Sequence, residues 1–278
     1  MMKTIGFLGG GHMTTGVIAG LLRSGDDASK IAPSDIWVFD RNPDKLSSLG
    51  NNFGINTAVD NLEMVANADV LVLSVKPQAL KEALVPLRDL MQEKQPLLMS
   101  LAAGIRCESI DSWLGGGFAI ARAMPNMASA IGFGATGIFA NQKVTSAQQQ
   151  FASQLMNSVG ITHWVKRESE IDLVTALSGS GPAYFMLFIE HLVKSAVAAG
   201  LDPQGAKMLA LQTARGTTEL IQASDKSIAS LIDSICIAGG TTEQAVQSFR
   251  ADRMDAMVAK AFAAAKIRAE QLADELSA

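Results

Sequence analysis

A glycine- and threonine-rich stretch near the C-terminal end has the residue types of an anion site. It reads Ile237-Ala238-Gly239-Gly240-Thr241-Thr242-Glu243. Two glycines let backbone amides converge on a ligand, and two threonines supply hydroxyls. From Glu243 onward the sequence predicts a helix, whose N-terminus attracts an anion. We therefore predict a pocket for a small carboxylate, and a simple helix N-cap at Thr242 is the alternative.

A second glycine cluster, Gly9-Gly10-Gly11-His12-Met13-Thr14, directly follows the first predicted strand. Gly9 permits a tight turn, Gly11 lets a pyrophosphate approach the backbone, and the next helix presents its N-terminus. Thr14 stands where a third Gly or Ala is usual. An ordinary turn is the alternative, but the position after the first strand favours a dinucleotide. The predicted cofactor contacts here are Leu8, Gly9, Gly10, Gly11, His12 and Met13.

The choice of cofactor depends on Asp40-Arg41-Asn42, which ends the second predicted strand. A carboxylate at Asp40 accepts hydrogen bonds from a ribose diol and repels a 2′-phosphate, which favours NAD. Arg41 and Asn42 can hold that phosphate, which favours NADP. In a third interpretation, Asp40 caps the following turn and Arg41 is solvated. We predict NADPH, with NADH as the alternative.

Three further loops follow the third, fourth and fifth predicted strands. In an open α/β sheet, ligands lie beyond the carboxyl ends of strands, so these loops are expected to contact the cofactor. Asn126 is expected to orient an amide or the substrate, with a turn asparagine as the alternative. Lys76 contacts phosphate, polarises the nicotinamide region, or is a solvated lysine at the start of the next helix. The remaining predicted cofactor contacts are Asn61, Val75, Lys76, Pro77, Ala102, Ala103 and Gly104.

Short apolar runs alternate with amphipathic stretches up to about residue 165, and helical sequence follows. We predict an α/β fold with an N-terminal Rossmann-like doubly wound parallel sheet (1–165) and an all-helical C-terminal dimerisation domain (166–278). Small residues dominate Ala256–Ala265, which favours a homodimer or higher homo-oligomer; tight packing within one chain is the alternative. The predicted strands are Thr4–Leu8, Ile36–Phe39, Val70–Val75, Leu97–Leu101, Ala119–Ala123, Gly137–Phe139 and Ile161–Val165. The predicted helices after them are 168–177, 182–199, 203–223, 227–235, 243–250 and 252–276.

Composition excludes several function classes. The chain has 278 residues, 48% of them hydrophobic, and a formal charge of −4. It carries no polybasic tract, so no nucleic-acid partner is expected. Its apolar stretches are short or broken by charge and glycine, and we expect neither a signal peptide nor a membrane partner but a cytoplasmic protein. Two cysteines, Cys107 and Cys236, and three histidines without ligand spacing predict no disulfide framework and no metal.

Motifs from the first strand to the C-terminal helices resemble those of the pyrroline-5-carboxylate reductase family. The sequence departs from the family pattern at His12, Met127 and Ala238, where Asn or Gln, Thr, and Pro are usual. The matching segments are Ile5-Gly6-Phe7-Leu8-Gly9-Gly10-Gly11-His12-Met13, Val75-Lys76-Pro77, Ala102-Ala103-Gly104, Arg122-Ala123-Met124-Pro125-Asn126, Leu177-Ser178-Gly179-Ser180-Gly181-Pro182-Ala183-Tyr184 and Gly239-Gly240-Thr241-Thr242.

The resemblance implies reduction of (S)-1-pyrroline-5-carboxylate to L-proline by NAD(P)H, the last step of proline biosynthesis. It implies that backbone amides of Gly240, Thr241 and Thr242 bind the substrate carboxylate, and that the Thr242 hydroxyl hydrogen-bonds the ring nitrogen. A threonine hydroxyl is a poor acid near neutral pH, so we assign Thr242 orientation and proton relay. The resemblance gives Ser178, Ser180 and Asp225 secondary substrate roles.

Two other functions are possible on the sequence. One is another imine reductase or a hydroxyacid dehydrogenase of the same architecture, which usually presents a catalytic Lys or His. Here the candidates, Lys194 and His191, stand well down the helix from Ser178–Pro182. The other is a non-catalytic nucleotide sensor, which would have no reason to keep a carboxylate pocket.

Overall fold

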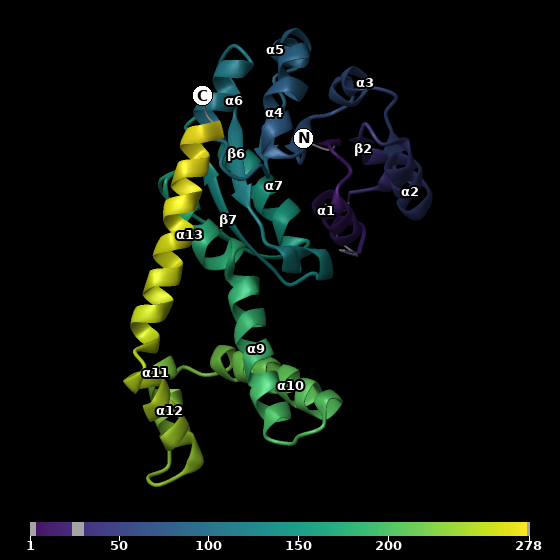
Figure 1. Ribbon diagram of the computed structural model, residues 1–278. Helices are drawn as coiled ribbons and strands as arrows, with labels where there is room; N and C mark the ends of the chain where they lie inside the picture. The colour runs from purple at the N-terminus through teal and green to yellow at the C-terminus, as the bar shows by residue number, and fades with distance from the viewer. Residues whose placement is uncertain (1–3, 24–30, 277–278) are drawn as a thin grey trace. The chain divides into compact units, whose positions relative to one another are not determined.

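The computed structural model describes residues 4–23 and 31–276. The chain packs into two compact units (Figure 1). The sheet unit comprises Met1–Ser180 and Ala265–Ala278, and the helical unit comprises Gly181–Ala264. This packing boundary lies after the predicted division at 165/166, and that division stays a prediction.

A single eight-stranded sheet forms the centre of the sheet unit, with the order β3-β2-β1-β4-β5-β6-β7-β8. The predicted α/β fold is confirmed, and all seven predicted strands are present with small shifts at their ends. Only β3, which is short and polar, was not predicted. The strands are β1 (Ile5–Leu8), β2 (Ile36–Phe39), β3 (Asn56–Thr57), β4 (Val70–Leu73), β5 (Leu97–Ser100), β6 (Ile120–Met124), β7 (Gly134–Ala140) and β8 (Gly160–Trp164).

The sheet departs from the predicted parallel arrangement at one junction. Strands β3 to β6 are parallel, but β7 runs antiparallel to β6, and β8 is parallel to β7. The connection between β6 and β7 passes through the short 3-10 helix η3 (Met127–Ile131). A parallel crossover needs about a dozen residues or more, usually with a full helix, so this connection returns the chain antiparallel.

Helices cover both faces of the sheet, as the alternation of strand side chains requires. Ile5 and Phe7 of β1 are fully buried in one core with residues of α1 and α7. Leu71 and Leu73 of β4 are buried in a second core with residues of α4, α5 and α6. The helices of this unit are α1 (His12–Arg23), η1 (Pro33–Asp35), α2 (Pro43–Phe53), α3 (Asn61–Ala66), α4 (Pro77–Leu84), η2 (Val85–Leu87), α5 (Arg88–Lys94), α6 (Cys107–Trp113), α7 (Ser146–Asn157) and α8 (Glu170–Val174).

A π-helix follows α8 and leads into the helical unit. This segment, η4 (Thr175–Gly179), is bounded by a hydrogen bond from Ser180 N–H to Thr175 O at 2.8 Å. The helices beyond it agree with the predicted ones to within a few residues. They are α9 (Gly181–Ala198), α10 (Pro203–Gln222), α11 (Ile228–Ile235), α12 (Thr241–Ala251) and α13 (Met254–Leu276), whose last turns belong to the sheet unit.

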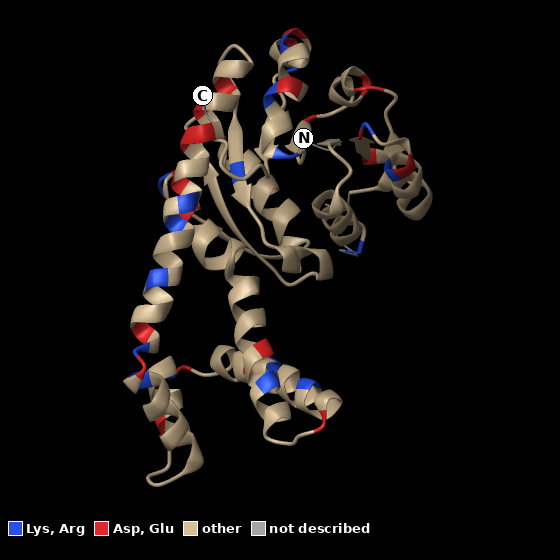
Figure 2. Ribbon diagram, viewed as in Figure 1, with Lys and Arg blue, Asp and Glu red and all other residues tan. Residues whose placement is uncertain are grey.

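The helical unit has almost no core of its own. Of residues 181–264, all of them described, only Gly181 and Ala206 are buried. The continuous helical run Glu170–Ala198 is long and apolar enough to cross a membrane, by length and composition only. The sequence had predicted only apolar stretches that are short or interrupted. Most of α9 carries no charge (Figure 2). These apolar faces are exposed in a single chain.

Candidate active site

The glycine turn between β1 and α1 is closed on one side and open on the other. Gly9 has φ 108°, and its N–H donates to Phe39 O at 2.8 Å. A Cβ on Gly9 would lie 3.0 Å from the backbone of Ser74, whereas a Cβ on Gly11 would meet nothing within 4 Å. The backbone at Gly11 can therefore be approached closely by a ligand, next to the N-terminus of α1. This geometry fits a pyrophosphate group.

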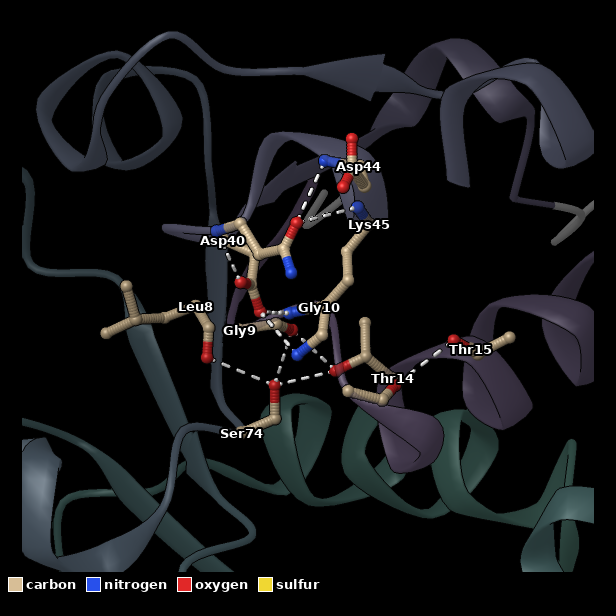
Figure 3. A network of polar contacts seen from close by, with 11 residues as sticks. Leu8, Gly9, Gly10, Thr14, Thr15, Asp40, Asp44, Lys45 and Ser74 are labelled. Atoms are coloured by element: carbon tan, nitrogen blue, oxygen red, sulfur yellow. Dashed lines mark hydrogen bonds and ion pairs between the residues drawn. The ribbon is translucent and has the colours of Figure 1, made fainter. Parts of the chain in front are cut away.

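Thr14 explains the missing third glycine of the motif. It is fully buried; its hydroxyl donates to Gly9 O at 2.7 Å and lies 2.7 Å from Ser74 Oγ. The Ser74 hydroxyl in turn reaches the carbonyls of Leu8 and Gly9 at 3.1 and 2.9 Å (Figure 3). These two hydroxyls fasten the turn to the end of β4. Ser74 was not predicted, because the sequence placed it inside the strand Val70–Val75, whereas β4 ends at Leu73.

The Asp40 carboxylate also supports this turn. It accepts hydrogen bonds from Gly10 N–H at 2.8 Å and Asn42 N–H at 2.9 Å, and Lys45 Nζ lies 3.6 Å away. Burial raises the pKa of Asp40, but the two amides and Lys45 outweigh it and hold the pKa below its usual value. Asn42 caps α2 by accepting from Asp44 N–H, and Arg41 is exposed. The interpretation of Asp40 as a turn cap thus describes its contacts.

The other predicted cofactor loops lie at the carboxyl ends of neighbouring strands. Lys76 immediately precedes α4, at the end of β4, and Gly104 follows β5 with φ 76°. A Cβ on Gly104 would lie 3.3 Å from the backbone of Leu272 in α13, so this glycine also serves helix packing. Asn61 begins α3, and its buried Oδ1 has no hydrogen-bond partner among the described residues. A buried acceptor without a partner can be satisfied by a hydroxyl or amide of a bound ligand.

Asn126 supports the π-helix η4. Its Nδ2 donates to Ser178 O at 3.0 Å, and its Oδ1 accepts from Ala135 N–H at 3.3 Å. Ser178 O needs this donor because Pro182, four residues on, has no N–H. Both ends of the Asn126 amide are therefore engaged within the chain. Its predicted contact with an amide or the substrate stays a prediction.

Alternate residues of β6 and its following loop hold the segment from Glu168 to Gly179. Buried Arg122 lies 3.2 Å from Glu168 Oε1 and 3.8 Å from Asp172 Oδ1. Burial raises the pKa of Asp172, and Arg122 only partly opposes this. A Cβ on Gly179 would lie 2.8 Å from Met124 Cε, so a larger residue there would require the Met124 side chain to move. Arg122 and Met124 of β6 and Asn126 just beyond it therefore all contact the segment from Glu168 to Gly179.

The carboxylate loop lies between α11 and α12. Gly240 is the N-cap of α12 and no side chain caps this end, so Thr242 is the second helical residue and not a cap. Gly240 N–H donates to Ile237 O at 2.8 Å, and Gly239 N–H donates to Glu243 Oε2 at 2.8 Å. First-turn amides of a helix have no acceptor within it, so those of Thr241 and Thr242 can bind an anion. The Gly240 amide, predicted to join them, is already paired.

The remaining predicted substrate residues are distributed over both units. Ser178 and Ser180 lie in the sheet unit, where Ser178 Oγ donates to Val174 O at 3.1 Å. Asp225 is exposed in the loop between α10 and α11 of the helical unit. Within residues 4–23 and 31–276, no group of three or more His, Cys, Asp or Glu side chains converges as a metal site.

The fold and the open glycine turn define a dinucleotide-binding protein. Residues 4–104 match the family model described as NADP oxidoreductase, coenzyme F420-dependent. Residues 168–272 match the model described as pyrroline-5-carboxylate reductase dimerisation. Pyrroline-5-carboxylate reductase of Pseudomonas aeruginosa is 40% identical over 272 residues, covering 98% of this chain and 97% of the relative. That of Vibrio alginolyticus is 37% identical, covering 97% of each chain.

Solved structures agree with the sequence matches. A pyrroline-5-carboxylate reductase from Coxiella burnetii has a TM-score of 0.92 and 38% identity, covering 98% of this chain and 99% of that one. The Plasmodium falciparum pyrroline carboxylate reductase with NADP bound has a TM-score of 0.85 and 28% identity, covering 98% and 100%. This chain belongs to the pyrroline-5-carboxylate reductase family.

Proposed function

We propose that this chain reduces (S)-1-pyrroline-5-carboxylate to L-proline with NADPH, the final step of proline biosynthesis. One observation carries the proposal: α12 begins without a side-chain cap, in a chain that matches pyrroline-5-carboxylate reductases over nearly its whole length. This helix start offers free amides to a small carboxylate. A nucleotide sensor would not need it.

The bound cofactor supplies a hydride to the imine carbon. The chain's own part is to hold and orient it. The glycine turn and the N-terminus of α1 bind the pyrophosphate, and Arg41 with the amide group of Asn42 binds the 2′-phosphate. The loops after β4 and β5 line the rest of the cofactor. Asn61 offers its unpartnered oxygen to a hydroxyl of the cofactor.

The substrate is held at the start of α12. The amides of Thr241 and Thr242 bind the ring carboxylate, and the Thr242 hydroxyl hydrogen-bonds the ring nitrogen. The Thr242 side chain is half-buried and does not cap the helix, and we assign its hydroxyl to this contact. Because its pKa is far above neutral, it orients and relays a proton that comes from solvent or from an imine already protonated. Catalysis rests on proximity and electrostatics.

The test is a steady-state assay of the purified protein. Pyrroline-5-carboxylate is supplied with NADPH or NADH in parallel, and oxidation of each cofactor is followed. We expect turnover with both and a higher kcat/KM with NADPH. No turnover with either cofactor would rule out the proposed activity.

Two neighbouring threonines provide a matched test of the site. We expect Thr242→Ala to lower kcat/KM by about 100-fold and Thr241→Ala by less than about threefold, since only Thr242 contributes its side chain. The Kd for NADPH should change little in either variant. Comparable losses in both would mean that the Thr242 hydroxyl has no role of its own.

We also propose that the active form is a cytoplasmic homodimer or a higher homo-oligomer. The apolar side chains of the helical unit need cover, and a second copy of the same unit supplies it. The unit also has an apolar hollow of about 500 Å³ lined by Ile232, Val246 and Phe249 among others, which suits side chains of a second copy. Large exposed side chains include Phe185, Met186, Leu187, Met208, Leu211, Ile232 and Met257.

A further inference from the structure

The Asp40 side chain is directed toward the glycine turn. Its Oδ2 accepts from Gly10 N–H at 2.8 Å and its Oδ1 from Asn42 N–H at 2.9 Å, and only 15% of the side chain is exposed. A Cβ on Gly10 would lie 3.3 Å from Asp40 Cβ, so the two residues are in close contact. The carboxylate thus joins the turn after β1 to the end of β2.

Lys45 balances the charge of this carboxylate. From the first turn of α2 its side chain reaches back to the glycine turn, where Nζ lies 3.6 Å from Asp40 Oδ2 (Figure 3). Half of the Lys45 side chain remains exposed. The Asp44 carboxylate lies on the other side of this helical turn, away from Asp40 (Figure 3). A free carboxylate at the end of β2 would repel a 2′-phosphate, but this one is compensated by two amides and an ammonium group.

We propose that Asp40 is a positioning residue for the pyrophosphate turn and does not read the ribose, and that Lys45 makes this corner accept a 2′-phosphate. The proposal rests on the cofactor part of the proposed function. In the sequence, Asp40 favoured NAD whereas its neighbours favoured NADP, and the proposal gives the carboxylate and the cations different roles. Asp40 shapes the turn for either cofactor, and the cations select NADPH.

The first test is a thermodynamic cycle that combines the substitution Asp40→Asn with removal of the ribose 2′-hydroxyl from the ligand. Dissociation constants of NADH and 2′-deoxy-NADH are measured by fluorescence for the wild type and Asp40→Asn. We expect the substitution to weaken both ligands by the same factor, about tenfold, because it loosens the turn. The matched control Asp44→Asn removes a charge from the same corner and should change either Kd by less than about twofold.

An effect of Asp40→Asn that disappears with 2′-deoxy-NADH would overturn the proposal, because Asp40 would then bind the 2′-hydroxyl. Thermal unfolding establishes that the variant is folded. If it is not, Asp40→Ser, which keeps one acceptor, replaces it in the same cycle.

The second test concerns Lys45. We expect Lys45→Gln to raise the Kd for NADPH about fivefold and that for NADH by less than about twofold, because it removes a cation and leaves the Asp40 carboxylate with its two amide donors alone. The exposed Lys143, on the loop after β7, provides the control Lys143→Gln. Equal changes for both cofactors, or none, would contradict the proposal. Binding needs no imine, so these results stand apart from failure of the proposed reaction, which appears only in turnover.

Discussion

The two units of this chain bury their side chains in different ways. In the sheet unit, residues such as Phe7, Leu71 and Phe118 are fully buried between the sheet and its helices. In the helical unit, Phe185 of α9 is 70% exposed and no large apolar residue is buried. One unit therefore contains the packing that stabilises it, and the other presents the same residue types at its surface. The difference supports the proposal that a second chain covers the apolar side chains of the helical unit.

Charged groups show the same contrast. Arg122 is only 3% exposed and pairs with Glu168 and Asp172 inside the sheet unit. The ion pair between Lys194 and Glu190 in α9 has both side chains largely in solvent. Buried charge clusters need their partners, whereas exposed pairs contribute little to stability. Of these two sets of ion pairs, the one expected to stabilise the fold therefore lies in the sheet unit.

The largest effect is expected from a charge placed on the exposed apolar face of α9. Phe185→Asp should raise the dissociation constant of the oligomer at least 1,000-fold, about 4 kcal/mol, because the carboxylate would be buried against the second copy. Sedimentation equilibrium measures this. The matched control is Ile161→Asp on β8, a residue that is 72% exposed, for which we expect no change in assembly. If both variants assembled equally well, the exposed apolar face of α9 would have no special part in assembly.

In the sheet unit the corresponding change is Arg122→Met. It leaves Glu168 and Asp172 without their buried cation, and we expect the free energy of unfolding to fall by about 3 kcal/mol or more. The control is Arg106→Met, which removes an exposed ion pair to Asp274 and should cost less than about 1 kcal/mol. Urea unfolding monitored in the sheet unit gives both values. If the loss in unfolding free energy depended on protein concentration, the sheet unit would not be stabilised by its own packing alone.

The π-helix between the units allows a rescue experiment. Asn126→Ala leaves the Ser178 carbonyl without its donor, and we expect a loss of about 1–2 kcal/mol in unfolding free energy. Adding Pro182→Ala supplies an N–H four residues after Ser178. It should recover part of the loss in the double variant. Strictly additive effects would show that Asn126 acts in some other way.

The smallest effect is a pH dependence at Asp40. Since its folded pKa lies below the usual 3.8, the ionised form stabilises the fold at higher pH, and this contribution is lost as pH falls through the folded value. In unfolding experiments on wild type and Asp40→Asn, the pH-dependent part of the difference should be about 0.5 kcal/mol near pH 6 and shrink below about pH 4. A difference that grows with acid would contradict the amide contacts.

Much of the fold could be predicted because its signals are local. Apolar runs such as Val70–Leu73 define strands, and Pro203 at the start of α10 marks a helix boundary. The glycine turn was predicted from its spacing together with its position directly after the first strand. The direction of β7 was not, because it depends on how the chain turns after β6 and not on the strand's own residues.

Side-chain partnerships were the part that sequence could not supply. Thr14 and Asn126 were each noted from the motifs, but their partners Ser74 and Ser178 lie far away in the chain. The start of α12 was misplaced for a similar reason. Glu243 binds the amide of Gly239 and so begins the helix two residues earlier, at Thr241.

We propose that the apolar side chains of the helical unit are covered by a second copy. Sedimentation velocity of the wild-type protein tests this by measuring the number of chains per particle. Samples run from about 10 µM to about 10 nM, with helix content followed by circular dichroism. We expect two or more chains per particle at the higher concentrations, with helix content falling wherever monomers form. A monomer at about 10 µM that keeps its full helix content would contradict the account.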